Sequence, residues 1–184
     1  MAIGLICAAL QACARAPTPV GTGTAPPVAQ LGPQQAVAPS RVVEPGAGPL
    51  GRTQVGKASY YAPRFNGRTM ADGQRYEPKG TAAASKTLPL GTTVKVTNLD
   101  TDKSAIAQVE DRGPYVRGRI IDVSANVAEK LEMEDAGVAH VTVKPIAVPH
   151  PNGTITLGSG AAELPSWMVE KAVQMTERLA PVFH

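Results

Sequence analysis

Aromatic residues are scarce in this sequence, at 4% of 184 residues, and none lies before residue 60. Because aromatic side chains dominate the burial of most cores, this absence argues against a folded domain in the first third of the chain. Hydrophobic residues still make up 43% of the sequence, so the remainder can form one core. The seven aromatic residues are Tyr60, Tyr61, Phe65, Tyr76, Tyr115, Trp167 and Phe183.

Excess charge of one sign is also missing. The formal net charge is +3, and no basic run or cluster of basic and aromatic residues occurs. We therefore predict no nucleic-acid partner. A mild positive charge remains compatible with an anionic partner such as cell wall.

Long hydrophobic runs are limited to residues 1–12, which are too few to span a bilayer. The run is either a signal-peptide core or a frayed or buried N-terminal segment. It ends in Leu-Gln-Ala-Cys, which is similar to a lipobox, so we predict a signal peptide over 1–12 and a lipid anchor on Cys13. No Lys or Arg precedes the run, which departs from the usual signal-peptide pattern.

Cysteine is nearly absent, with only Cys7 and Cys13. Cleavage before Cys13 would remove Cys7 and leave no thiol for a disulfide or a metal. Ala14 follows, rather than an Asp that would indicate inner-membrane retention, so we expect anchoring in the outer membrane, facing the periplasm. The histidines, His140, His150 and His184, lack metal-ligand spacing, and we predict no metal and no cofactor.

Residues 13–54 are rich in proline and glycine, with four charged residues and no aromatic one. Such a segment cannot bury enough apolar surface to offset its ordering entropy, so we predict a disordered, lipidated tether. Stiffened by proline at roughly 3 Å per residue, it could hold a domain on the order of 100 Å from a membrane. A linker without functional consequence is the alternative.

The next region, 55–147, has short runs with β-type patterning between turn signals. One helix is predicted from residue 125 to 133, with Ser124 as its N-cap. Short strands with a single helix favour a small closed β-barrel, in which no strand edge is left open. The predicted strands cover residues 55–61, 92–97, 104–110, 119–123 and 138–143.

Residues 148–184 are predicted to form a C-terminal tail with a possible helix over 165–179. Trp167, Val169, Val173 and Leu179 would form its apolar stripe. The helix either docks on the barrel or extends freely.

The densest group of reactive side chains is Glu110-Asp111-Arg112, which ends a predicted strand and meets a Gly-Pro turn. Asp111 follows Val109 by two positions, so it is expected on the inward face, partly buried beside Arg112. A carboxyl group there can serve as a general acid or base. The simpler alternative is that Asp111 caps the turn and pairs with an arginine.

These and other motifs together resemble the rare lipoprotein A (RlpA) family of the bacterial envelope. The resemblance covers nearly all of residues 55–146 and implies a six-stranded double-psi β-barrel. The motifs are GKASYY (56–61), ADGQRY (71–76), TLPLGT (87–92), VKVTNL (94–99), DRGPY (111–115) and GRIIDVS (118–124).

The resemblance also implies an activity: lytic transglycosylation of peptidoglycan between N-acetylmuramic acid and N-acetylglucosamine, preferably on peptide-free glycan. Of the family's three ionisable site residues, the chain keeps the Asp, as Asp111. Its Glu position is Gln74 and its His position is Ser85. Neither replacement titrates near neutral pH, so both are expected only to bind sugar hydroxyls.

Two functions therefore stay open. The first is a monomeric enzyme in which Asp111 acts as general acid and then as base, because the 6-hydroxyl of the muramic sugar is a tethered nucleophile. The second is a binding protein that kept the glycan groove and lost turnover. A structural lipoprotein that links envelope layers is a third reading.

Several further residues are candidates for the glycan-binding groove. Tyr60, Tyr61, Arg112 and Tyr115 are predicted to contact sugar, with barrel packing an equal alternative for the tyrosines. Asp72 and Glu77 flank Gln74 and are expected to be solvated turn residues; the alternative is that one of them supplies the missing carboxylate. Arg119 and Asp122 are expected to form a structural pair.

Overall fold

The structure is a computed structural model that describes residues 42–43 and 48–179. All of these belong to one compact unit, Ala38–His184. The predicted signal peptide, Cys13 and nearly all of the tether lie outside the described residues.

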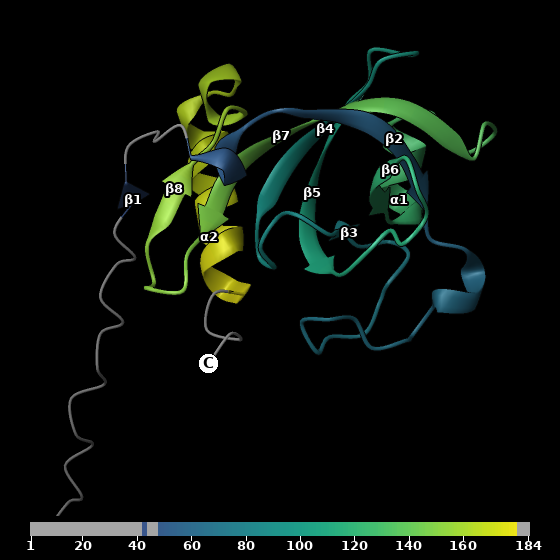
Figure 1. Cartoon of the computed structure of the whole chain (residues 1–184), viewed down its shortest axis with the longest axis horizontal. Coiled ribbons are helices and arrows are strands. Elements are labelled where there is room, and N and C mark those ends of the chain that lie inside the picture. Colours follow the sequence, from purple (N-terminus) through teal and green to yellow (C-terminus); the bar gives the residue numbers. More distant parts are fainter. Residues whose placement is uncertain (1–41, 44–47, 180–184) are drawn as a thin grey trace, which may run out of the picture. The chain divides into compact units, whose positions relative to one another are not determined.

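Six strands close into a barrel, as predicted (Figure 1). Around the ring the order is β7, β2, β6, β3, β5 and β4, and β4 pairs with β7 to close it. Two pairs, β2 with β6 and β3 with β5, are parallel, while the other pairings in the ring are antiparallel. The strands are β2 (Gln54–Tyr60), β3 (Ala82–Ser85), β4 (Thr93–Asn98), β5 (Ser104–Asp111), β6 (Arg119–Val123) and β7 (Val138–Pro149).

The barrel is filled mainly by small side chains. A narrow six-stranded ring leaves little room inside, so alanine and valine fit where aromatic residues would not. This explains how a chain with few aromatic residues still has a closed core. The strand residues of the core include Ala58, Ala83, Val94, Val96, Ala107, Val109, Ile121, Val123 and Val141, each at most 1% exposed.

Strand β3 (AAAS) was not predicted from the sequence. All four of its residues are buried, so the strand has no polar alternation to reveal it. Alanine also has a low β-propensity, and the strand forms because β5 and β6 flank it on both sides.

Strand β7 continues six residues beyond the predicted end at 143. The prediction stopped before Pro145, since proline cannot donate a ladder hydrogen bond. Pro145 pairs with Val94 beside a register irregularity between Thr93 and Val94. Such bulges are where a sheet accepts proline.

Helix α1 (Ala125–Lys130) begins after Ser124, as predicted, and the Val127 amide donates to the Ser124 hydroxyl at 3.4 Å. The helix ends three residues earlier than the predicted Met133. Glu132 adopts a positive φ of 53°, and the Met133 amide bonds back to the Ala128 carbonyl. This left-handed residue stops the helix.

Helix α2 (Ser166–Leu179) docks on the barrel rather than extending freely, and it contacts β7 and β4; β8 (Ile155–Leu157) extends the sheet from β7 (Figure 1). Its buried residues are Ala172, Thr176 and Leu179, whereas Trp167 is 59% exposed. The predicted stripe was therefore wrong at Trp167, because the docked face centres on the 172–176–179 row.

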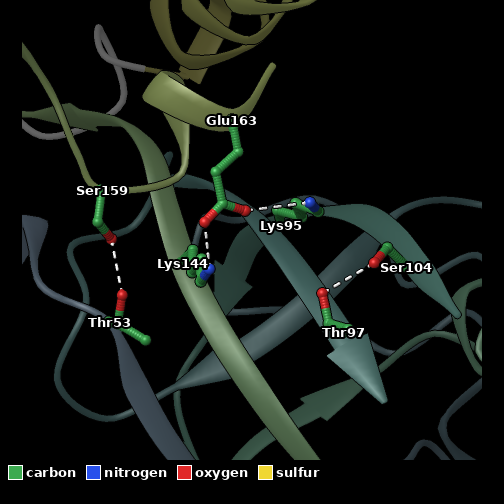
Figure 2. A network of polar contacts seen from close by, with 7 residues as sticks. All are labelled: Thr53, Lys95, Thr97, Ser104, Lys144, Ser159 and Glu163. Carbon is green, nitrogen blue, oxygen red and sulfur yellow. Dashed lines mark hydrogen bonds and ion pairs between the residues drawn. The ribbon is translucent and has the colours of Figure 1, made fainter. Parts of the chain in front are cut away.

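Polar contacts fasten the C-terminal segment to the barrel (Figure 2). Glu163, in the 3₁₀ turn η3 (Ala161–Glu163), reaches Lys95 of β4 at 3.2 Å and also pairs with Lys144 of β7. The Ser159 and Thr53 hydroxyls lie 3.1 Å apart. Short elements complete the fold: β1 (Val42–Val43), which pairs with β8, and the 3₁₀ turns η1 (Pro49–Gly51) and η2 (Pro63–Phe65).

Candidate functional site

Asp111, the last residue of β5, has its carboxyl group held by three donors. The Tyr61 hydroxyl donates to Oδ2 at 3.0 Å. The Ala71 and Arg112 amides donate to Oδ1 at 3.0 and 2.8 Å. These donors come from the end of β2, from the 66–81 loop and from the next residue, so the carboxyl group has a defined orientation.

An aromatic cluster positions the Tyr61 hydroxyl. The Tyr61 ring lies 4.5 Å from that of Tyr76 and 5.6 Å, edge-on, from that of Phe65. Burial, followed by the charge of Asp111, raises the pKa of Tyr61. The hydroxyl therefore stays protonated at physiological pH and acts as a donor to Asp111.

Arg112 points into the barrel end through its guanidinium group. Its Nη1 donates to the carbonyls of Ser85 and Leu88 at 3.1 and 2.6 Å. This ties the end of β5 to the turn after β3. In the described arrangement the Arg112 guanidinium thus braces the site, and its predicted role in binding sugar stays a prediction.

Ser85 is buried, with 1% of its surface exposed. Its hydroxyl accepts weak hydrogen bonds from the Thr87 and Leu88 amides at 3.4 and 3.3 Å. The Ser85 hydroxyl is therefore hydrogen-bonded within the turn that follows β3. Ser85 therefore has almost no exposed surface with which to make its predicted contact with a sugar.

Gln74 lies on the 66–81 loop and lines a polar pocket of about 480 Å³. Glu110 enters this pocket from β5. The pocket brings together amide, guanidinium and carboxyl groups, which are the groups that bind sugar hydroxyls. Its lining residues are Gln74, Arg75, Glu77, Gly80, Thr81, Ala82 and Glu110.

Asp72 is buried at 4% exposure, so its prediction as a solvated turn residue was wrong, whereas Glu77 is exposed as expected. Asp72 Oδ1 accepts a hydrogen bond from the Gln74 backbone amide at 2.9 Å, and the buried Asp72 Oδ2 has no hydrogen-bond partner among the described residues. The Asp72 amide donates to the Glu110 carbonyl at 3.0 Å. The loop that carries Gln74 is thus joined to the end of β5.

The sequence places Glu110 in an acidic pair with Asp111 but assigns it no role of its own. Burial, followed by the charge of Asp72, raises the pKa of Glu110 to about 7. Ala83 pairs with Val109 and Ala84 with Asp111, so Glu110 has no opposite residue on β3. Irregularities of this kind are where side chains depart from regular alternation along a strand, so alternation does not predict the position of Glu110.

Neither Tyr60 nor Tyr115, the other tyrosines predicted to contact sugar, donates a hydrogen bond to Asp111 among the described contacts. The Tyr60 hydroxyl donates to the Glu134 carbonyl at 3.3 Å, and its ring packs against the core. Tyr115 is 82% exposed on the loop after β5. Tyr115 is free to stack on a ligand, whereas Tyr60 serves packing.

The expected structural pair is present. Arg119 and Asp122 are 3.3 Å apart, and the Ser59 hydroxyl donates to the second Asp122 oxygen at 2.6 Å. Both charged side chains are largely buried between β2 and β6. The ion pair lies within β6, and the Ser59 hydroxyl links it to the parallel strand β2.

A larger pocket, of about 690 Å³, lies between η3, the end of β8 and the start of α2. Its walls are mainly apolar, and Glu170 is its one ionisable residue. Among the described residues no cluster of three metal-ligating side chains occurs. No helix within that same part of the chain has both the length and the apolar character needed to cross a membrane.

Fold and site together define a double-psi β-barrel protein with an oriented carboxyl group at the rim of its barrel. Residues 53–143 match the family described as lytic transglycolase. This domain belongs to the RlpA family of double-psi β-barrels, as its motifs predicted.

The similar curated proteins are named endolytic peptidoglycan transglycosylase RlpA. The one from Vibrio cholerae is 45% identical over 103 residues, which is 56% of this chain and 39% of that protein. The one from Neisseria meningitidis is 48% identical over 94 residues, 51% of this chain and 39% of the relative. The chain thus spans well under half the length of these relatives.

Solved structures with a similar fold include the Streptomyces papain inhibitor, at 25% identity and a TM-score of 0.43 over 52% of this chain and 96% of the inhibitor. An expansin from Clavibacter michiganensis is 19% identical, with a TM-score of 0.43 over 54% of this chain and 52% of the expansin.

Proposed function

We propose that this protein is a lytic transglycosylase that cuts peptidoglycan glycan strands between N-acetylmuramic acid and N-acetylglucosamine. The observation that carries the proposal is the Asp111 carboxyl group, oriented by Tyr61, Ala71 and Arg112 at the rim of the barrel. Relatives with this activity in their names support it, and the family supplies the substrate class.

The chemistry needs few ionisable groups. The glycosidic bond from the anomeric carbon breaks, and the 6-hydroxyl oxygen of the same muramic sugar bonds to that carbon, which forms a 1,6-anhydro ring. One proton moves to the leaving oxygen, and one leaves the 6-hydroxyl. Because the nucleophile is already tethered, Asp111 has only protons to move and no water to activate.

The test is product analysis by mass spectrometry. Purified full-length protein is incubated with sacculi and with peptide-free glycan, and Asp111→Asn is the matched control. Anhydromuramic products from the wild type, reduced about 10²–10⁴-fold in the variant, would support the proposal. Equal product from both proteins would place the chemistry elsewhere.

A second function rests on a specific observation: Gln74 cannot titrate, and the Ser85 hydroxyl is buried within its turn. A barrel that binds glycan without turnover would have these properties. In that case neither protein yields product, while both sediment with sacculi.

We also propose that Cys13 carries the lipid that anchors the protein in the outer membrane, with the barrel facing the periplasm. The lipobox-like ending Leu-Gln-Ala-Cys supports this. More than one acyl chain gives stable anchoring. Cys13→Ala should abolish labelling by radioactive palmitate in cells, and continued labelling would contradict the proposal.

A further inference from the structure

We infer that Glu110 is a second catalytic carboxyl group of this site and donates the proton to the leaving glycosidic oxygen. This inference rests on the proposed transglycosylase function. It assigns Asp111 the other half of the reaction, removal of the 6-hydroxyl proton. The simpler mechanism has Asp111 serve in both roles in turn.

The first support is position. Glu110 and Gln74 line the same polar pocket of about 480 Å³, although 36 positions separate them in sequence. Gln74 holds a neutral amide there, so it can bind a sugar but cannot supply a proton. Glu110 is the carboxyl group that β5 contributes to this pocket.

The second support is how Glu110 comes to face the pocket. It is the residue without a partner at the β3–β5 irregularity, directly before Asp111. A bulge costs a regular ladder position and is typically found where a side chain is re-aimed near a site. The loop at 71–74 contacts both residues here: the Asp72 amide donates to the Glu110 backbone carbonyl, and the Ala71 amide donates to the Asp111 carboxyl group.

The third support is division of labour between the two carboxyl groups. The oxygens of Asp111 act as acceptors in all three of their hydrogen bonds. For Glu110, burial and the nearby charge of Asp72 raise the pKa to about 7, so much of it holds a proton at neutral pH. A group that holds a proton and an oriented acceptor, on consecutive residues of β5, supply the two functions that general acid–base catalysis requires.

Charged groups around Glu110 are of both signs. Arg75 and Glu77, from the 66–81 loop, line the pocket, and the charge of Asp72 acts on Glu110. Asp111 and Arg112 follow it in the chain. A pH profile therefore has to be read against variants rather than from the wild type alone.

The proton balance is complete without a further reactant. Glu110 loses a proton to the leaving oxygen as the glycosidic bond breaks. Asp111 gains the proton of the 6-hydroxyl as the new carbon–oxygen bond forms. Exchange with water then restores both groups.

The experiment compares release of anhydromuramic product by the full-length wild type, Glu110→Gln and Glu129→Gln between about pH 5 and pH 9. Glu129 is exposed on α1 and does not line the pocket, so its variant controls for loss of a negative charge. We expect Glu110→Gln to lower kcat at least tenfold and to remove the loss of rate above about pH 7. Glu129→Gln should leave both unchanged.

A fourth protein separates chemistry from folding: the double variant Glu110→Gln with Gln74→Glu. It returns a carboxyl group to the same pocket, so it should recover part of the lost kcat. A merely structural role for Glu110 would not be rescued in this way.

Two outcomes would overturn the inference, and they differ. If the wild type forms product and Glu110→Gln keeps its kcat and pH profile, Glu110 has no catalytic role while the proposed function stands. If no protein forms product, the proposed function fails and the inference fails with it.

Discussion

The site around Asp111 is built by hydrogen-bond donors from distant parts of the chain. Its hydrogen-bond donors stand 50 and 40 positions away, at Tyr61 and Ala71, as well as next to it at Arg112. None of these contacts follows from the local motif around Asp111. They depend on the tertiary fold, because β6 and β3 lie between β2 and β5 in the sheet and the Ala71 amide comes from a separate loop.

Replacing Tyr61 by Phe tests this orientation. The variant keeps the ring that packs on Phe65 and Tyr76 and removes only the hydroxyl. Because a hydrogen bond to a charged group is worth about 1.5–3 kcal/mol, we expect product formation to fall roughly tenfold or more. In an Asp111→Asn background the same change should have little further effect, and a full additional loss would contradict the coupling.

Asp72 provides a second test at the residue scale. Asp72→Asn keeps the acceptor for the Gln74 amide and removes the charge that contributes to the raised pKa of Glu110. We expect the pKa of Glu110 to fall below about 7 without reaching its ordinary value, because burial is the larger cause. Carboxyl NMR titration measures this, and an unchanged pKa would refute the Asp72 contribution.

The sequence predicted the central residue of the site but not its neighbours. Asp111 was identified from its motif, and Tyr61 was one of several tyrosines whose hydrogen-bond partner no local pattern reveals. Glu110 was given no role because strand alternation assigns it to the face opposite Asp111, and its unpaired position beside β3 is not visible in the sequence. Asp72 looked solvated because turn residues usually are, and its burial depends on the packing of the loop against β5.

At the scale of elements, the first residue of each strand with one buried face was predicted to within one position. β4, β5 and β6 show alternation that a single sequence displays. β3 is buried on both faces and β7 passes through Pro145, so each depends on its partners rather than on its own pattern. Helix α2 was predicted, but its docked face was not, since two rows of apolar residues compete on it.

The contact between α2 and β4 gives an element-scale prediction. The buried Thr93 and Thr176 hydroxyls lie 2.9 Å apart, and Thr93 also donates to the Ala172 carbonyl at 3.2 Å. Thr176→Val keeps the shape and removes the hydroxyl, so it should lower the free energy of unfolding by about 1 kcal/mol in urea denaturation.

The matched test is a double-mutant cycle with Thr93→Val. If the hydroxyls interact, the double variant should lose less stability than the sum of the two single variants. Additive losses would mean that the helix docks through its apolar residues alone.

For the whole molecule, Glu110 links stability to pH. Its pKa is about 7 in the folded state against 4.5 for the ordinary side chain, so the folded state binds more protons between these values. Stability supplied by this group therefore declines as pH rises through that window. Glu110→Gln should become more stable relative to the wild type from about pH 4.5 to about pH 7.5 in thermal unfolding.

Other titrating groups are shared by both proteins and cancel in the difference. Glu163 is one of them: hydrogen bonds from Lys144 and Lys95 lower its pKa, so its contribution to stability is lost as pH falls. A stability difference that stays constant over this pH range would show that Glu110 is not buried as described.

The central claim is that the barrel breaks glycan by intramolecular attack at Asp111, and one measurement tests it most directly. Peptide-free glycan is digested by the full-length protein in ¹⁸O-labelled water, and the masses of the products are measured by mass spectrometry. The account predicts anhydromuramic ends that are one water lighter than hydrolysis products, carry no label and disappear with Asp111→Asn. Labelled reducing ends, or unlabelled anhydro ends that persist in Asp111→Asn, would contradict it.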